Sequence, residues 1–282
     1  MKKQQIILIA GGVILFCLIF FFGRTVPPKK AISSDSTTSQ DTPPDLDIQS
    51  ILTVARQKLT PEQQASVSKL ESAVGRGDVK EQQIRINKQL ATFWKDTAHA
   101  LLPYAYYTAE AAKLENSEKS LTFAAHFLLD GLRGQENPSI RKWMAVQSKE
   151  LFEKALVQNP GNDSLKVGLG SCYLFGNISE TPMQGITMIR EVAERDTTNM
   201  YAQFMLGVGG MMSGQYDRAI ERFEKVASYQ PENPEVLVML AESYERKGDK
   251  QNAVRWYERG KAVIKNPEII QEIDHRIGDL KK

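Results

Sequence analysis

Two consecutive stretches decide the fold: Met200–Asn233, MYAQFMLGVGGMMSGQYDRAIERFEKVASYQPEN, and Pro234–Pro267, PEVLVMLAESYERKGDKQNAVRWYERGKAVIKNP. In register, the second stretch repeats the first with a period of 34 residues: Leu206-Gly207 aligns with Leu240-Ala241, Gly214 with Gly248, Ala219 with Ala253, and Phe223 with Tyr257. A fixed period of this length indicates stacked helix–turn–helix units. The small residues let the two helices of a unit approach closely, and the glycines suit the turn that ends the first helix.

A third copy precedes these two. Residues 163–199 contain Leu169-Gly170, Tyr173 and Gly185-Ile186, with three extra residues in the turn. The three copies resemble the tetratricopeptide repeat (TPR) family, whose pattern is W-x2-L-G-x2-Y…A-x3-F…P. The sequence departs from it at several positions, with Gln203 in place of the tryptophan and Gly210 in place of the tyrosine. The resemblance covers residues 116–265, about half of the chain, and implies an all-α, right-handed solenoid of helix pairs.

Helix signals continue on both sides of the repeats. Thr60-Pro61-Glu62-Gln63 combines an N-cap residue, a first-turn proline and a glutamine three residues after the cap. The Asn-Pro pairs at 137, 233 and 266 are typical of the same kind of helix start. We therefore predict an N-terminal helical region at residues 46–115 and a C-terminal capping helix at residues 266–282. No alternating run of β-branched residues indicates a strand.

The chain begins with a strongly apolar stretch. Residues 4–23 carry no charge, and residues 6–22 read IILIAGGVILFCLIFFF. A helix of roughly 18 such residues spans about 27 Å, close to the hydrocarbon thickness of a bilayer. A cleaved signal peptide is the alternative, but phenylalanines 20–22 stand where small residues precede a cleavage site. We predict an uncleaved signal anchor, a single transmembrane helix, at residues 1–23.

The flanks of this stretch bear on membrane orientation. Lys2 and Lys3 precede it, whereas Arg24, Lys29 and Lys30 follow it, so the charge rule alone does not decide. The short basic tail favours a cytoplasmic N-terminus and a periplasmic body on the inner membrane. Residues 24–45 contain four prolines, many serines and threonines and no large apolar cluster, which predicts a disordered tether.

Composition excludes several classes of function. The 36 basic and 34 acidic side chains give a formal charge of only +2, so nothing indicates a nucleic-acid partner. Two cysteines and three scattered histidines do not suggest a metal site, and no catalytic or nucleotide-binding motif occurs. His126 and Cys172 lie in apolar helical patterns typical of packed side chains. We predict no enzymatic activity, no catalytic residue and no cofactor.

The family resemblance implies a partner-binding groove lined by the first helix of each repeat. Carried over by register, its residues are Val167, Leu174, Phe175, Tyr201, Phe204, Val208, Met211, Met212 and Val238. The leading hypothesis is a membrane-tethered scaffold that binds peptide segments of envelope or secreted proteins. The alternative is a structural subunit that forms homo-oligomers, with the groove filled by the chain's own helices, for which residues 46–99 are candidates.

Overall fold

The computed structural model describes residues 46–76, 79–178 and 183–282, which belong to one compact unit spanning residues 43–282. The predicted anchor at 1–23 and tether at 24–45 lie outside these residues. The described part is all-α, with a short π-helix η1. Its elements are α2 (Ile48–Gln57), α3 (Pro61–Arg76), α4 (Lys80–Thr92), η1 (Phe93–Thr97), α5 (Leu101–Glu115), α6 (Glu118–Arg133), α7 (Pro138–Gln158), α8 (Asp163–Gly176), α9 (Met183–Arg195), α10 (Met200–Met212), α11 (Tyr216–Tyr229), α12 (Pro234–Lys247), α13 (Lys250–Val263) and α14 (Pro267–Leu280). No helix within these ranges is long and apolar enough to cross a membrane.

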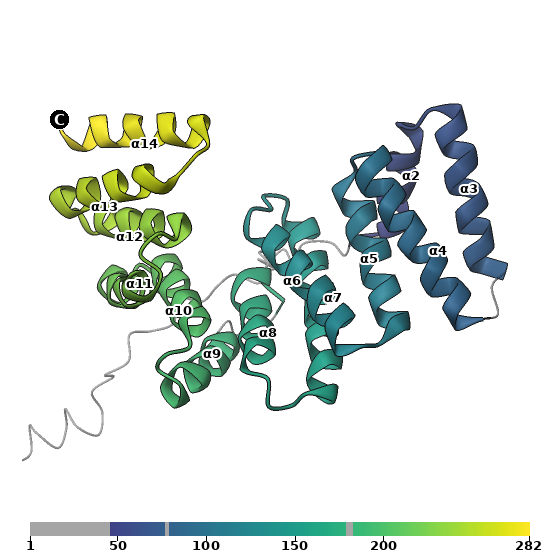
Figure 1. The fold of residues 1–282 in the computed structure, drawn as a ribbon, viewed down its shortest axis with the longest axis horizontal. Coiled ribbons are helices and arrows are strands. Elements are labelled where there is room, and N and C mark those ends of the chain that lie inside the picture. Colours follow the sequence, from purple (N-terminus) through teal and green to yellow (C-terminus); the bar gives the residue numbers. More distant parts are fainter. Residues whose placement is uncertain (1–45, 77–78, 179–182) are drawn as a thin grey trace, which may run out of the picture. The chain divides into compact units, whose positions relative to one another are not determined.

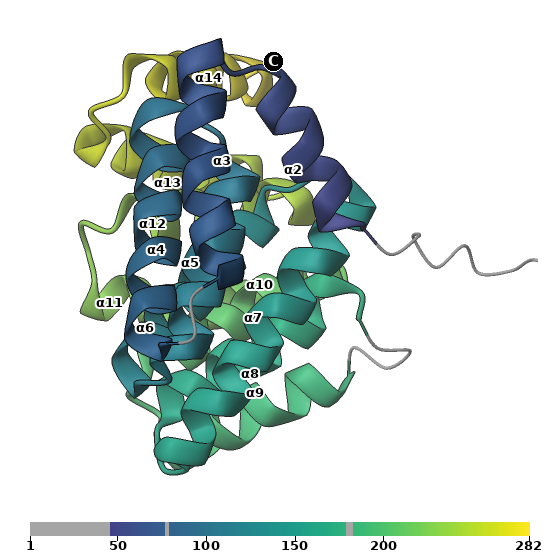
Figure 2. The ribbon, with the colours of Figure 1, turned by 90° about the vertical axis from the view of Figure 1, so that its right-hand side faces the viewer.

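The helices pack as consecutive antiparallel pairs, which run α4/α5, α6/α7, α8/α9, α10/α11 and α12/α13 (Figure 1). The first helices of the last four pairs, α6, α8, α10 and α12, also pack against one another in succession. At the C-terminal end α14 covers α13, and at the N-terminal end α3 packs beside α4 while α2 packs on α5 (Figure 2). This is the stacked arrangement that the repeat period predicts.

Polar caps fix where the helices begin. The side chains of Asn137, Asn162, Asn233 and Asn266 each accept a hydrogen bond from a backbone N–H in the first turn that follows. At α3, Thr60 N donates to Gln63 Oε1 at 3.0 Å and Gln63 N donates to Thr60 Oγ1 at 3.3 Å. These bonds satisfy N–H groups that have no partner within the helix. The helix starts predicted from these residues are confirmed.

Close approach of neighbouring helices, within a pair and between pairs, depends on small residues. A Cβ at Gly207 of α10 would lie 2.6 Å from the Phe223 ring of α11, and Phe223 is completely buried. A Cβ at Gly168 of α8 would similarly lie 2.4 Å from the Phe152 ring of α7. In the three-residue-longer repeat, a Cβ at Gly185 of α9 would lie 2.2 Å from the backbone oxygen of Gly170. The lack of a side chain at these glycines therefore sets the spacing between neighbouring helices.

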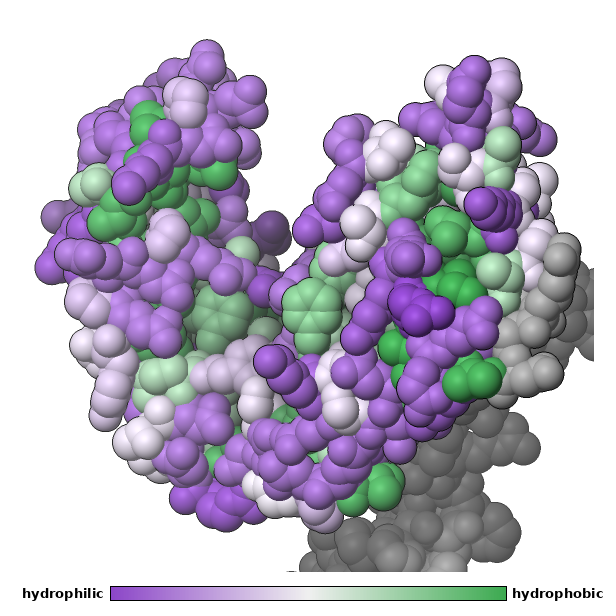
Figure 3. Space-filling view, turned by 45° about the vertical axis from the view of Figure 1, so that its right-hand side comes forward, coloured by the Kyte–Doolittle hydropathy of each residue, from purple (hydrophilic) through white to green (hydrophobic). Residues whose placement is uncertain are grey.

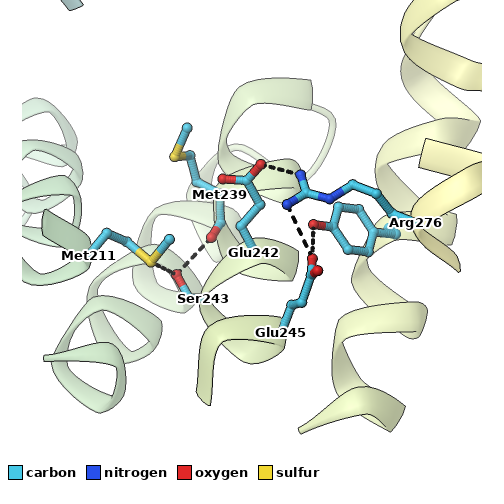
Figure 4. Close-up of polar contacts among 7 residues, drawn as sticks. Met211, Met239, Glu242, Ser243, Glu245 and Arg276 are labelled. Atoms are coloured by element: carbon cyan, nitrogen blue, oxygen red, sulfur yellow. Dashed lines mark hydrogen bonds and ion pairs between the residues drawn. The ribbon is translucent and has the colours of Figure 1, made fainter. Parts of the chain in front are cut away.

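The C-terminal helix α14 is held by apolar and ionic contacts. Ile273 and Ile277 are buried in a cluster with Tyr257. Figure 4 shows Arg276 of α14 reaching Glu242 and Glu245 of α12, with N–O distances of 2.6 and 3.4 Å. Tyr257 Oη donates to Glu245 Oε2 at 2.6 Å, and the Arg276 guanidinium lies 5.4 Å from the Tyr257 ring. These contacts cover the face of the last helix pair, as expected of a cap on a repeat array.

The spacing argument predicts opposite effects for two glycine-to-alanine substitutions. Gly207→Ala forces a methyl group against the buried Phe223 ring and should lower the free energy of unfolding by about 1–3 kcal/mol. Gly278→Ala, in α14 with open space around it, should raise that free energy by about 0.5–1 kcal/mol because alanine is the better helix former. Urea unfolding of residues 43–282 followed by circular dichroism measures both. Equal stability of the two variants would contradict the spacing argument.

Candidate functional site

The nine predicted groove residues lie on three neighbouring helices. Val167, Leu174 and Phe175 are on α8, Val238 is on α12, and the other five are on α10. Val167, Leu174, Phe204 and Val208 are buried, each with at most 9% of its surface exposed. Phe175, Tyr201, Met211 and Val238 are half-buried, and Met212 is 60% exposed. The structure thus brings the set together but uses most of its members in packing between helices.

Helix α6 supplies contacts to two aromatic members of this set, Phe204 and Tyr201. Arg133 Nη2 donates to Glu235 Oε1 of α12 at 2.6 Å, and the Arg133 guanidinium lies 5.5 Å from the Phe204 ring centroid. The His126 ring lies 5.9 Å from the Tyr201 ring and 5.0 Å from the Phe152 ring. We name the three residues Arg133, Phe204 and Glu235 the Arg133 bridge. These contacts come from within the repeat array, not from residues 46–99.

Burial controls the protonation of the groups beside this bridge. The pKa of His126 is lowered, chiefly because burial disfavours the imidazolium, and the nearby Asp130 carboxylate opposes that effect. The pKa of Asp130 is raised, again chiefly by burial, while His126 and Arg133 act in the opposite direction. The lowered pKa favours a neutral His126 ring near pH 7, which suits its contacts with Phe152 and Tyr201.

A cleft of about 600 Å³ opens between α4, η1, α5 and α6. Its walls include Lys88 and Lys95 on the α4–η1 side and Lys119 and Phe123 on α6. Whereas α6, α8, α10 and α12 pack against one another, α4 joins the array chiefly through α5. The space is left unfilled because three side chains on these walls are small: Ala91, Ala111 and Ala112. We call this space the α4–α6 cleft.

The α4–α6 cleft combines positive charge with apolar surface. Lys88 Nζ pairs with Glu115 Oε2 at 2.7 Å, and Lys95 Nζ lies 5.9 Å from the Tyr104 ring centroid. Phe123 is 59% exposed, and Thr108 Oγ1 is buried without a hydrogen-bond partner among the described residues. Lysines beside an exposed aromatic ring can bind a segment that offers both a carboxylate and an apolar side chain. In the space-filling view of Figure 3, green apolar side chains gather in patches on a mostly polar face.

The residues of the α4–α6 cleft do not stand out in the sequence. Lys88 and Lys95 are seven residues apart, a spacing that places two side chains on the same face of a helix. This spacing is the sequence signal for one side of the cleft. Lys119 and Phe123 come from a different helix, and the contact that places them opposite α4 runs through α5. Such an arrangement depends on tertiary packing, which the sequence pattern does not reveal.

The described residues offer neither a cluster of metal-binding side chains nor an accessible cysteine. No group of three or more His, Cys, Asp or Glu side chains in these ranges could hold a metal ion. Cys172 is buried, and burial raises the pKa of its thiol to about 12. Its Sγ lies 3.2 Å from Ser148 Oγ within the core. A thiol in this setting is a packing group, because the nucleophilic form of cysteine is the thiolate.

Comparison with known proteins supports the repeat assignment. Residues 211–270 match the family model described as tetratricopeptide repeat. This segment carries the signature of the TPR family. It runs from the last two residues of α10 through α11, α12 and α13 into the first turn of α14. Comparison with curated proteins finds no significant sequence match.

Three solved structures resemble this chain at low sequence identity, one of them with a TM-score of 0.50. A thermophilic TPR protein of Thermus thermophilus is 13% identical, with a TM-score of 0.50 over 72% of this chain and 98% of that one. MamA residues 41–end from Desulfovibrio magneticus are 17% identical, with a TM-score of 0.43 over 66% of this chain and 96% of that one. YrrB, described as a TPR protein with an unusual peptide-binding site, is 16% identical, with a TM-score of 0.42 over 73% and 97%. The likeness to the Thermus thermophilus protein, at 13% identity, shows a TPR-like solenoid fold and nothing about function.

The Arg133 bridge predicts the effect of removing its central residue. Arg133→Ala loses the ion pair to Glu235 and uncovers the Phe204 ring, so an apolar dye should bind more strongly. The free energy of unfolding should fall by about 1 kcal/mol, because a partly exposed ion pair and a cation–π contact are each modest. Dye fluorescence and urea unfolding measure the two effects. Arg246→Ala, at an exposed position of α12, is the matched control and should change neither.

Proposed function

We propose that the protein is a non-enzymatic scaffold that binds peptide segments of partner proteins in the α4–α6 cleft. The observation that carries this proposal is a cleft of about 600 Å³ whose lysines and Phe123 are exposed and not buried in the core. That volume lies in the usual range for ligand sites. The match of residues 211–270 to the TPR family agrees with a role in protein interaction.

The chemistry of the cleft favours one kind of segment. Asp96 and Glu115 offset only part of the positive charge that Lys88, Lys95 and Lys119 bring to the lining. An acidic side chain in the partner segment would restore balance, and an apolar side chain beside it would cover Phe123. Burying the exposed part of one aromatic ring contributes about 25 cal/mol for each Å² removed from water. The segment is therefore acidic with an apolar anchor.

The proposed setting is the inner membrane. The uncharged stretch at residues 4–23 would anchor the chain, and residues 24–45 would give the helical body reach above the bilayer. With the N-terminus in the cytoplasm the body lies in the periplasm, where envelope and secreted proteins are the available partners. This setting rests on the sequence alone.

A second candidate is a structural subunit that forms homo-oligomers. The observation that favours it is the packing of Phe204, Val208 and Leu174, which leaves little of the predicted groove open to a peptide. Light scattering of residues 43–282 distinguishes the two. A dimer that forms without added peptide favours the structural subunit, and a monomer favours the scaffold.

Site-specific crosslinking in the native membrane tests peptide binding in the cleft. A photoreactive p-benzoylphenylalanine in place of Phe123 should give a discrete crosslinked partner. The same substitution at Val157, which is 81% exposed on α7, is the control and should not give that product. A product formed equally from both positions would contradict binding in the cleft.

Charge reversal in the cleft sharpens the same experiment. Combined Lys95→Glu and Lys119→Glu substitutions should remove most of the adduct at position 123, because they repel an acidic segment. Lys265→Glu changes the net charge at an exposed position outside the cleft and should leave the adduct unchanged. Equal yields from the two charge variants would rule out an acidic segment.

Reporter fusions test the proposed orientation. Alkaline phosphatase fused after Lys282 should be active, because this reporter needs the disulfides that form outside the cytoplasm. A fluorescent protein that folds only in the cytoplasm, fused at the same point, should be dark. The opposite pair of results would place the body in the cytoplasm and change the class of partner.

A further inference from the structure

A second cavity, of about 560 Å³, lies between α2, η1 and the start of α5. We call it the α2–α5 pocket. Its volume lies in the usual range for sites that bind small molecules. Among the described residues it shares no lining residue with the α4–α6 cleft. It is therefore a separate site, which the proposed scaffold role does not explain.

The backbone between α4 and α5 creates the space. The π-helix η1 spans Phe93–Thr97, and His99 after it adopts a left-handed conformation with φ of 49°. Ala100 N donates to Trp94 O at 2.8 Å, which closes the wide turn. Single π-helical turns are rare and often occur at functional sites. Because Ala98 and Ala100 on this wall are small, the space beside the turn stays unfilled.

The pocket is apolar from its inner end to its mouth. Trp94, which has no exposed surface, and Leu59, which is 9% exposed, lie at the inner end. Val54 and Leu101 are 52% and 53% exposed, so they mark the mouth. An occupant with a long apolar part would remove this surface from water, which is the main driving force for burial.

The charged and amide side chains of the lining favour an anion. Lys58 is exposed at this site, and no ion pair joins it to another residue in the described ranges. None of the described lining residues is Asp or Glu. Gln63 Oε1 already accepts from Thr60 N at 3.0 Å, and Gln135 Oε1 accepts from Asn137 N at 3.0 Å. The pocket thus presents one positive charge that no side chain of its described lining neutralises.

The same groups disfavour an extended peptide as the occupant. Such a peptide brings a backbone N–H at nearly every residue, and each N–H needs an acceptor when it is buried. The oxygens of Gln63 and Gln135 each accept one hydrogen bond already, so few side-chain acceptors are left in the described lining. An alkyl chain brings no polar group into the pocket. A single charge at its end can stay at the mouth, beside Lys58.

We propose that the α2–α5 pocket binds an aliphatic monocarboxylate, a free fatty acid, with its alkyl chain inside the pocket and its carboxylate at Lys58. The apolar walls suit the chain, and the charge of Lys58 complements the single negative charge of the head. Each methylene group removed from water should tighten binding about fourfold. An exposed ion pair contributes less than such a chain. Chain burial therefore supplies most of the affinity, and Lys58 selects an anionic head.

Fluorescence quenching tests the proposal on the full-length chain in phosphatidylcholine nanodiscs. The chain has three tryptophans, Trp94, Trp143 and Trp256, so Trp143→Phe with Trp256→Phe leaves Trp94 as the only fluorescent indole. The probe is 10-bromodecanoate, whose bromine at the end of the alkyl chain quenches a nearby indole. It should quench Trp94 saturably above the background measured with decanoate that lacks bromine. Absence of saturable quenching would overturn the proposal.

Two further probes separate the chain from the head. The acid 8-bromooctanoate lacks two methylene groups and should bind about fifteenfold more weakly. The alcohol 10-bromodecanol keeps the chain but has no charge, so it should bind about threefold more weakly than the acid of the same length. Equal affinity of the two acids would contradict burial of the chain, and equal affinity of the alcohol and its acid would contradict pairing with Lys58. Either result would overturn the proposal.

Variants of the mouth locate the binding site. Lys58→Glu should weaken binding of 10-bromodecanoate at least about fivefold, because it replaces attraction of the carboxylate by repulsion. Lys265→Glu also changes an exposed lysine that follows the end of a helix, so it is the matched control and should bind like the parent chain. Leu101→Asp places a carboxylate at the mouth and in the first turn of α5, where a negative charge favours the helix, and should weaken binding as well. Equal affinities of the Lys58 and Lys265 variants would overturn the proposal.

A variant of the α4–α6 cleft separates this site from the proposed peptide site. That cleft also combines lysines with an exposed aromatic ring, so it could attract the same probe. Lys119→Glu, on α6, should leave the quenching of Trp94 by 10-bromodecanoate unchanged. A loss of quenching in this variant would assign the fatty acid to the α4–α6 cleft and overturn the proposal. Crosslinking at Phe123 is measured without fatty acid, so failure of one proposal leaves the other standing.

Discussion

The contact between a glycine backbone and a buried aromatic ring determines how closely the helices of this array stack. Gly207 against Phe223 and Gly168 against Phe152 allow ring-to-backbone contact, and Gly170 with Gly185 brings α8 and α9 even closer. Because each helix pair is held at a fixed spacing, the first helices α6, α8, α10 and α12 come into contact in turn. A change in one spacing would displace every later pair, since a stacked array has few contacts between distant repeats.

That stacking explains why the predicted groove is largely filled. Once α6, α8, α10 and α12 are packed in succession, Arg133 can reach Glu235, a residue 102 positions later, and lie over Phe204. A long side chain with a charged end covers apolar surface while it keeps an ionic partner, so a single residue performs both tasks. At the N-terminal end the ion pair of Lys88 joins α4 to Glu115 of α5, not to α6, and alanines line the walls of the α4–α6 cleft. The two ends of the array therefore differ in what they leave open to a partner.

The sequence was sufficient to predict the features that depend on local chemistry. The 34-residue period, the asparagine caps and the reciprocal pair of Thr60 and Gln63 all follow from short-range rules, and the helices begin where those rules indicate. The register also placed the nine groove residues on neighbouring helices. The covering of Phe204 and Tyr201 could not be predicted, because it depends on Arg133 and His126, which lie before the three clear repeat copies. The π-helix was equally hidden, since residues 93–97 carry no glycine or proline that would indicate a break.

The openings of the described chain are concentrated where the repeat pattern is weakest. Regular repeats bury their apolar faces against the next copy. Val236, Leu237 and Leu240 are buried in this way in the core shared by α10, α11 and α12. The segment from α2 to α6 departs from the period, and there a π-turn, a left-handed His99 and a run of alanines leave two cavities unfilled. In this chain, the surface open to a partner lies where one unit packs incompletely against the next. The irregular segment from α2 to α6 supplies that place, whereas the regular C-terminal pairs bury their apolar faces against one another.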